Sequence, residues 1–286
     1  MEGLIRKPVV SGLFYSDNPL SLIKEIEWSF SHHVGPGALP SSSEGQERLS
    51  IGYVSPHAGY VYSGPVAAHA YYHLSLEKTP DTIVIIGTNH SGLGENVSLA
   101  PWKEWETPLG KVMVDVEARD YLIKNASIIK PDYLAHIEEH SVEVQLPFIQ
   151  YIYSDKVKIV PIVIGIHTPE AAIDIAESIV RATNELSRDV VVLASSDFNH
   201  YESHDITVKK DEAAISKILE LNTHGFYKTL VDMDISICGP GGIMSLIEIA
   251  KRLKARAMLL KHATSGDISG NKTAVVGYAA IKFSRI

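Results

Sequence analysis

The chain has 286 residues, of which 45% are apolar and 21% charged, proportions that supply a sizeable buried core and exclude a largely disordered protein. Its 34 acidic and 26 basic side chains give a formal net charge of −8, and the lysines and arginines are scattered instead of forming a basic stripe. A nucleic-acid partner is therefore not expected, because phosphate binding requires clustered positive charge.

The N-terminal segment and the cysteine content predict a cytoplasmic protein. Arg6, Lys7 and Pro8 interrupt the region where a secretory signal needs an unbroken apolar run. No later run approaches the roughly 18 apolar residues of a membrane span, so we expect no membrane partner. Cys238 is the one cysteine, so no internal disulfide can form and nothing favours an oxidising compartment.

Short β-branched runs alternate with helical patterns along most of the chain, which predicts an α/β protein with helices packed on a sheet. Asn18-Pro19 and Thr168-Pro169 each combine a capping residue with a proline at the first helical position. In chain order we predict a helix after Asn18, a strand over 51–55, a helix near Gly64-Pro65, a strand over 82–87, a helix from Asp115, a strand over 157–165, a helix from Thr168, a strand over 189–194, helices from His204 and after Gly239, and a strand over 274–283.

Residues 35–47 are rich in Gly, Pro and Ser, which predicts a mobile surface loop between the first helix and the first strand. No internal repeat is visible. The candidate functional residues follow the ends of predicted strands, where open α/β sheets place their sites. We therefore expect a single domain over residues 1–286.

Three predicted strands end in segments that carry titratable side chains. His57 follows the first strand within Ser55-Pro56-His57-Ala58-Gly59-Tyr60, and His90 follows the second within Gly87-Thr88-Asn89-His90-Ser91-Gly92. The strand over 189–194 runs into Ser195-Ser196-Asp197-Phe198-Asn199-His200. Together they predict one shared site. Eight of the thirteen histidines are expected on the surface or in a satisfied core environment, namely His32, His33, His69, His73, His167, His204, His224 and His262.

Asp197 and His200 can meet if their segment turns helically, and a carboxylate paired with an imidazole would orient it and raise its basicity. The alternative role for Asp197 is a helix cap. Cys238 precedes Gly239-Pro240 and an apolar helical run, so its thiol is suited to act as a metal ligand or a nucleophile. The alternative for an isolated cysteine is a small buried apolar residue.

The segment from His136 to His140 has the H-x-x-E-H spacing of some zinc peptidases. Pro131 and Pro147 confine it, so the long helix that such a zinc site requires is not expected. The chain also lacks a G-x-S-x-G nucleophile motif and a G-x-x-x-x-G-K-[ST] phosphate loop, which excludes two common α/β functions.

A series of short motifs resembles the Memo family in order and approximate spacing over nearly the whole chain. They are Pro56-His57-Ala58-Gly59-Tyr60, Gly87-x-x-His90, Glu139-His140-Ser141-Val142-Glu143, Ser195-Ser196-Asp197-Phe198-x-His200 and Ile237-Cys238-Gly239. The family includes the Memo-like component, protein B, of the prokaryotic AmmeMemoRadiSam set. The resemblance thus raises the other proteins of that set as candidate partners.

The resemblance implies a three-layer α/β/α fold with a mostly buried mixed central sheet, similar to that of the class III extradiol dioxygenases, which use non-haem Fe(II). His57 and His90 correspond to the two iron-binding histidines, His200 to the acid/base histidine and His140 to a second pocket histidine. Cys238 stands where the dioxygenases have a glutamate ligand. A thiolate preserves the net charge of that ligand set but widens the choice of metal to Fe(II), Cu or Zn. Because a thiolate is oxidisable, ring cleavage does not transfer with the fold.

Three hypotheses follow. The first is a metal-dependent redox or oxygen-handling protein acting on an unknown small molecule, with His57, His90 and Cys238 as ligands. In it Asp197 orients His200 as general base and His140 contacts the substrate. The second is a metal-free hydrolase or transferase with Cys238 as nucleophile. The third is a binding or scaffold protein with a relic pocket. The sequence leaves open whether Glu143 and Tyr15 reach the pocket or support its walls.

Overall fold

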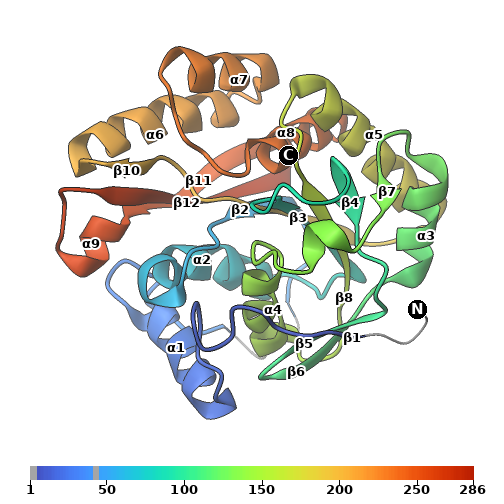
Figure 1. Cartoon of the computed structure of the whole chain (residues 1–286), viewed down its shortest axis with the longest axis horizontal. Helices are drawn as coiled ribbons and strands as arrows, with labels where there is room; N and C mark the ends of the chain where they lie inside the picture. The colour runs from blue at the N-terminus through green and yellow to red at the C-terminus, as the bar shows by residue number, and fades with distance from the viewer. Residues whose placement is uncertain (1–4, 41–44) are drawn as a thin grey trace.

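A computed structural model describes residues 5–40 and 45–286, and over these ranges the chain forms a mixed nine-stranded sheet with helices on both faces (Figure 1). Four parallel strands form the centre of the sheet, in the order β2 (Ser50–Ser55), β9 (Val190–Ser195), β3 (Thr82–Thr88) and β8 (Lys158–Ile164). One side continues through the antiparallel β12 (Val275–Arg285), which pairs with both β10 (His200–Glu202) and β11 (Ala255–Thr264). The other side adds β4 (Val97–Leu99) and β7 (Lys130–Pro131).

Helices bury both faces of this sheet. One face is covered by α1 (Pro19–Ser31), α2 (Tyr60–Ser75) and α4 (Leu146–Tyr153), and the other by α3 (Val116–Asn125), α5 (Pro169–Glu185), α6 (His204–Leu219), α7 (Thr223–Asp232) and α8 (Pro240–Arg252). The short elements are α9 (Ser265–Ser269), the 3₁₀ turns η1 (Leu134–His136) and η2 (Glu143–Gln145), and a small sheet of β1 (Ile5–Arg6), β5 (Glu104–Thr107) and β6 (Gly110–Met113). The predicted three-layer α/β/α fold with a mixed central sheet is confirmed.

The apolar run in β3 shows why the sheet is buried on both sides. Val84 and Ile86 point into one hydrophobic core, and Ile83 and Ile85 point into the other. Successive side chains of a strand face opposite ways, so a strand between two helical layers needs apolar residues at every position. All seven residues of β3 are buried accordingly.

Most predicted helix starts are confirmed. The side chain of Asn18 accepts a hydrogen bond from the Ser21 amide at the start of α1, and Thr168 caps α5 in the same way. The start of α2 was wrong, because the helix begins at Tyr60 and includes Pro65. Pro65 is the sixth residue of α2, so it removes one helical hydrogen bond, the one to the Val61 carbonyl group.

The predicted strands match β2, β3, β8, β9 and β12 to within one or two residues at each end. The sequence prediction missed α4, α7 and α9, the strands β4, β7, β10 and β11, and the small sheet. β11 lies at an edge of the main sheet and carries partly exposed polar residues, so it lacks a clear apolar alternation. α4 is strongly apolar but has only eight residues, too few to tell a buried helix from a buried strand by periodicity.

The predicted loop over 35–47 includes residues 41–44, which lie outside the described part of the chain. Its described residues contain no helix or extended strand, and Gln46 forms an isolated bridge with Glu77. Within 5–40 and 45–286, no helix has the length and apolar character needed to cross a bilayer.

Gly87 lets the segment after Glu139 approach the end of β3. A Cβ atom there would overlap Ser141 Oγ and lie 3.0 Å from Val142 Cγ2. We predict that Gly87→Ala lowers the free energy of unfolding by about 1–3 kcal/mol, as overpacking does, in denaturant titrations. Gly165 follows the neighbouring strand β8, and a Cβ atom added there would lie 3.6 Å from its nearest neighbours, an ordinary contact distance. Gly165→Ala should therefore change stability by no more than about 0.5 kcal/mol, and equal losses would contradict the packing argument.

Candidate metal centre

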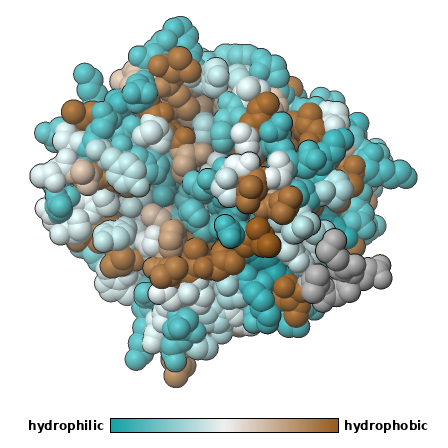
Figure 2. All heavy atoms as spheres, in the orientation of Figure 1, coloured by the Kyte–Doolittle hydropathy of each residue, from teal (hydrophilic) through white to brown (hydrophobic). Residues whose placement is uncertain are grey.

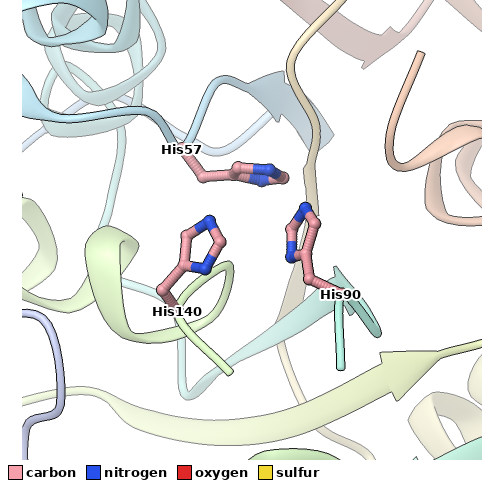
Figure 3. A group of neighbouring side chains, drawn as sticks. All are labelled: His57, His90 and His140. Carbon is pink, nitrogen blue, oxygen red and sulfur yellow. The ribbon is translucent and has the colours of Figure 1, made fainter. Parts of the chain in front are cut away.

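Three histidines from separate segments meet beyond the carboxyl ends of the central strands. His57 follows β2, His90 follows β3 and His140 precedes η2. One ring nitrogen from each lies within 4.8 Å of the others, and Figure 3 shows the three imidazoles turned toward a common space. The ring centroids of His90 and His140 lie 4.5 Å apart, and His57 is 5.3 Å from each. The shared site predicted at the strand ends therefore includes His140.

His57 is almost completely buried. Its Nδ1 lies 3.0 Å from Ser195 Oγ, and its Nε2 lies 3.1 Å from Cys238 Sγ. Burial lowers the pKa of His57 well below its ordinary value, and the neighbouring His140 and His90 lower it further. A neutral imidazole at this position can offer a lone pair, which is the form a metal ion requires.

Glu139 fixes the orientation of His90. Its carboxylate accepts hydrogen bonds from the His90 backbone amide at 2.8 Å and from His90 Nδ1 at 2.9 Å, and also from the amides of His140 and Ser141. Burial raises the pKa of Glu139, but the His90 hydrogen bond and the other contacts outweigh it and lower that pKa to about 2. The ionised carboxylate holds the proton on Nδ1 and leaves Nε2 of His90 as the free nitrogen.

His140 lies between two aromatic rings and the same carboxylate. Its ring stacks on His90, the Phe14 ring lies 4.7 Å away, and Glu139 Oε1 is 3.6 Å from Nδ1. Burial lowers the pKa of His140 to about 4. The sequence suggested that His140 contacts substrate, and the geometry also makes it a candidate ligand.

Cys238 approaches His57 from the side of α8. Its sulfur accepts a hydrogen bond from the Asp197 backbone amide at 3.2 Å. Burial, together with the nearby Asp197 carboxyl group, raises the pKa of the Cys238 thiol. The thiol therefore stays protonated unless a metal ion displaces the proton, which does not favour a free nucleophile.

Asp197 and His200 do not form the predicted pair. The Asp197 carboxylate instead accepts hydrogen bonds from the backbone amides of His57 at 2.8 Å and Ala58 at 3.3 Å. The chain after Phe198 enters β10 instead of a helical turn, so residues three apart do not face each other. Nδ1 of His200 lies 2.7 Å from the Ser236 carbonyl oxygen, which can only accept, so His200 carries its proton there.

Glu143 and Tyr15 support the walls of the site. Glu143 is fully buried and forms an ion pair with Arg6, and it also accepts hydrogen bonds from the amides of Val9 and Val10 and from the Tyr15 hydroxyl at 2.7 Å. These contacts fasten the N-terminal segment to the turn that carries His140. Neither side chain belongs to the histidine group.

Two further histidines have structural roles. His136 is buried at the end of the turn η1, with its ring 6.1 Å from that of Trp105. Residues 137–140 are not helical, so the H-x-x-E-H segment does not form the long helix of a zinc peptidase. His167 contacts Thr88 Oγ1 at 3.1 Å and accepts a hydrogen bond from the Gly241 amide. These contacts agree with the satisfied environment predicted for His167. The sequence prediction had missed the role of Glu139, whose position beside His140 was the available signal.

The buried pair of Arg6 and Glu143 should be sensitive to removal of one partner. We predict that Glu143→Ala lowers the free energy of unfolding by about 3–5 kcal/mol, because Arg6 is left as an uncompensated buried charge. The exposed pair of Lys228 and Asp232 provides the control, and Asp232→Ala should cost no more than about 0.5 kcal/mol. Denaturant titrations measure both, and a loss below about 1 kcal/mol for Glu143→Ala would contradict the argument.

The fold and the site together define an α/β protein with a histidine-lined candidate metal centre at the carboxyl edge of its sheet. The family model described as "Memo-like protein" matches residues 6–282. A "MEMO1 family protein" of Desulfurococcus amylolyticus is 58% identical over 97% of this chain and 98% of its own length. One from Sulfolobus acidocaldarius is 50% identical over 98% and 99%. The chain therefore belongs to the Memo-like family.

A solved structure shares the fold at much lower identity. The crystal structure of the uncharacterized protein JW3007 from Escherichia coli K12 superposes with a TM-score of 0.54 at 12% identity. The match covers 82% of this chain and 99% of that one. At this identity the likeness concerns the fold alone.

Proposed function

We propose that this protein binds a divalent transition metal, Fe(II) in the first place, and that it carries out redox or oxygen chemistry on a small molecule. The observation that carries the proposal is the pairing of His90 with Glu139. A histidine that binds a metal through one ring nitrogen commonly donates the N–H of the other to a carboxylate, which fixes the orientation of the ring.

The donor atoms suit such an ion. Metal–nitrogen bonds of about 2.0–2.1 Å place ligand nitrogens roughly 3–3.5 Å apart, so the three histidine nitrogens, now within 4.8 Å, need only a small inward movement. Imidazole and thiolate together suit Fe(II), Cu and Zn. Bound there, the metal would supply Lewis acidity or a redox couple.

The ligand atoms that lie within 4.8 Å of one another belong to His57, His90 and His140. We propose that His57 and His90 are two of the ligands and that Cys238 is the third. Cys238 Sγ lies 3.1 Å from His57 Nε2, a separation close to that of two ligands on one ion. The Asp197 amide that donates to the sulfur would stabilise a thiolate. His140 then faces the remaining side of the centre, where it contacts a substrate.

His200 is suited to move a proton. Its Nδ1–H is held by the Ser236 carbonyl group, which leaves Nε2 as the basic nitrogen. The hydrolase alternative has less support, because Cys238 contacts His57 and not His200, and burial keeps the thiol protonated.

The surface around the site suits a substrate with an apolar part. Three exposed apolar residues adjoin the site segments: Leu13 precedes Phe14, whose ring contacts His140, and Val61 and Ile137 follow and precede site histidines by three or four residues. They are between 44% and 80% exposed. Figure 2 shows an apolar band across the middle of one face, over the region where α2 and the turn before α4 lie in Figure 1. A substrate with an apolar part would gain binding free energy by burying it against this apolar band, whereas a purely ionic substrate would not.

Elemental analysis of anaerobically purified protein tests metal binding. We expect close to one iron, copper or zinc per chain, and at least a tenfold lower affinity in His57→Ala and His90→Ala, measured by competition with a chelator. His224 is exposed on α7, so His224→Ala is the matched control and should retain the metal. A wild-type protein that holds no metal after anaerobic reconstitution would refute the proposal.

Cobalt(II) substitution tests the third ligand. A cobalt–thiolate bond gives a near-ultraviolet charge-transfer band, which we expect in the wild type and in His140→Ala but not in Cys238→Ser. Absence of the band from the wild type, with affinity lost in His140→Ala, would assign the third position to His140 instead.

A further inference from the structure

The Nδ1 atoms of His57 and His90, which face away from the shared space of the site, have different kinds of partner. Nδ1 of His57 contacts the Ser195 hydroxyl group and no carboxylate. A neutral hydroxyl can donate or accept, so it does not by itself decide which ring nitrogen carries the proton. The remaining contacts of Ser195 Oγ settle the question.

Ser195 Oγ has three polar neighbours, and two of them have fixed roles. The hydroxyl donates to the Ser141 carbonyl oxygen at 2.6 Å, because a carbonyl can only accept. Gln145 Nε2 donates to the same oxygen at 2.8 Å. A hydroxyl has one hydrogen and two lone pairs, so the one lone pair that remains must accept the proton of His57 Nδ1.

The orientation of the Gln145 amide is fixed as well. Nε2 also donates to the Pro56 carbonyl oxygen at 2.9 Å, and Oε1 accepts from the Tyr71 hydroxyl group. Exchanging the amide nitrogen and oxygen would place two acceptors against each other at Pro56. Gln145 therefore always presents a donor to Ser195.

We propose that Ser195 is a positioning residue which, held by Ser141 and Gln145, fixes His57 as the tautomer with the proton on Nδ1. Nε2 of His57 then presents its lone pair toward Cys238 and the other site histidines. Turning the Ser195 hydrogen toward His57 would leave the fully buried Ser141 carbonyl without its partner, which disfavours the other tautomer by roughly 5-fold to 150-fold.

The hydroxyl relay, formed by Ser195 with Ser141 and Gln145, fixes the tautomer of His57, whereas a carboxylate fixes that of His90. Glu139 gives His90 a charged acceptor at a partly exposed position, whereas His57 is buried beside Asp197. If a carboxylate took the place of the Ser195 hydroxyl at Nδ1 of His57, it would place another negative charge in the interior beside Asp197, at a high desolvation cost. A neutral hydroxyl held by an amide fixes the same tautomer without that charge.

The test is NMR of ¹⁵N-histidine-labelled protein free of metal, in which the two ring nitrogens of each tautomer have distinct shifts. We expect His57 to be protonated on Nδ1 in the wild type, and to lose this preference in Ser195→Ala. The matched control is Ser178→Ala, because Ser178 is as buried as Ser195 but lies on α5, where its hydroxyl contacts Asp174. It should leave the tautomer unchanged.

The consequence for metal binding rests on the proposed function, whereas the tautomer does not. Zn(II) titration should show about 10–100-fold weaker binding in Ser195→Ala than in Ser178→Ala. Protonation of His57 on Nε2 in the wild type, or an unchanged tautomer in Ser195→Ala, would overturn the inference. A tautomer that shifts as expected in a protein that binds no Zn(II) would sustain the role of Ser195 and refute metal binding alone.

Discussion

A hydrogen bond from Nδ1 orients three imidazoles of the site, and the placement of its acceptors constrains the surrounding structure. In His90, His57 and His200 the Nδ1 atom meets an acceptor, respectively the Glu139 carboxylate, the Ser195 hydroxyl group and the Ser236 carbonyl group. With Nδ1 occupied, each Nε2 is left with its lone pair. The acceptors come from the loops and strand ends around the sheet, so the chemistry of the pocket depends on how closely those segments approach.

The close approach has identifiable causes in the packing. Gly87 makes room for Ser141, whose carbonyl group then orients the Ser195 hydroxyl. Glu143 binds the N-terminal segment to the same turn through Arg6 and two backbone amides. The turn between Glu139 and Gln145 thus supplies a ligand candidate, a carboxylate and two members of the hydroxyl relay, and its placement determines the geometry of all of them.

Burial gives the pocket its charge state. It lowers the pKa values of His57 and His140 and raises that of the Cys238 thiol, so these three groups are neutral while the Glu139 carboxylate nearby is ionised. A divalent cation would gain the attraction of that carboxylate and could convert the thiol to a thiolate. The same environment works against a free nucleophilic cysteine, which needs a lowered pKa.

The sequence by itself determined the layered α/β fold, the central strands and the gathering of His57 and His90, because strand periodicity and polar residues at strand ends are local signals. The motifs that resemble the Memo family are likewise present in the sequence itself. Only the tertiary structure decided that Asp197 binds the backbone amide of His57 and does not pair with His200. It also decided that Glu139 orients His90, and that Ser195, held by Gln145, contacts Nδ1 of His57. Most of those partners are distant in sequence, and Asp197 and His200 fail to pair because the chain between them enters β10. A hydrogen bond depends on the separation of two atoms, which sequence spacing does not reveal.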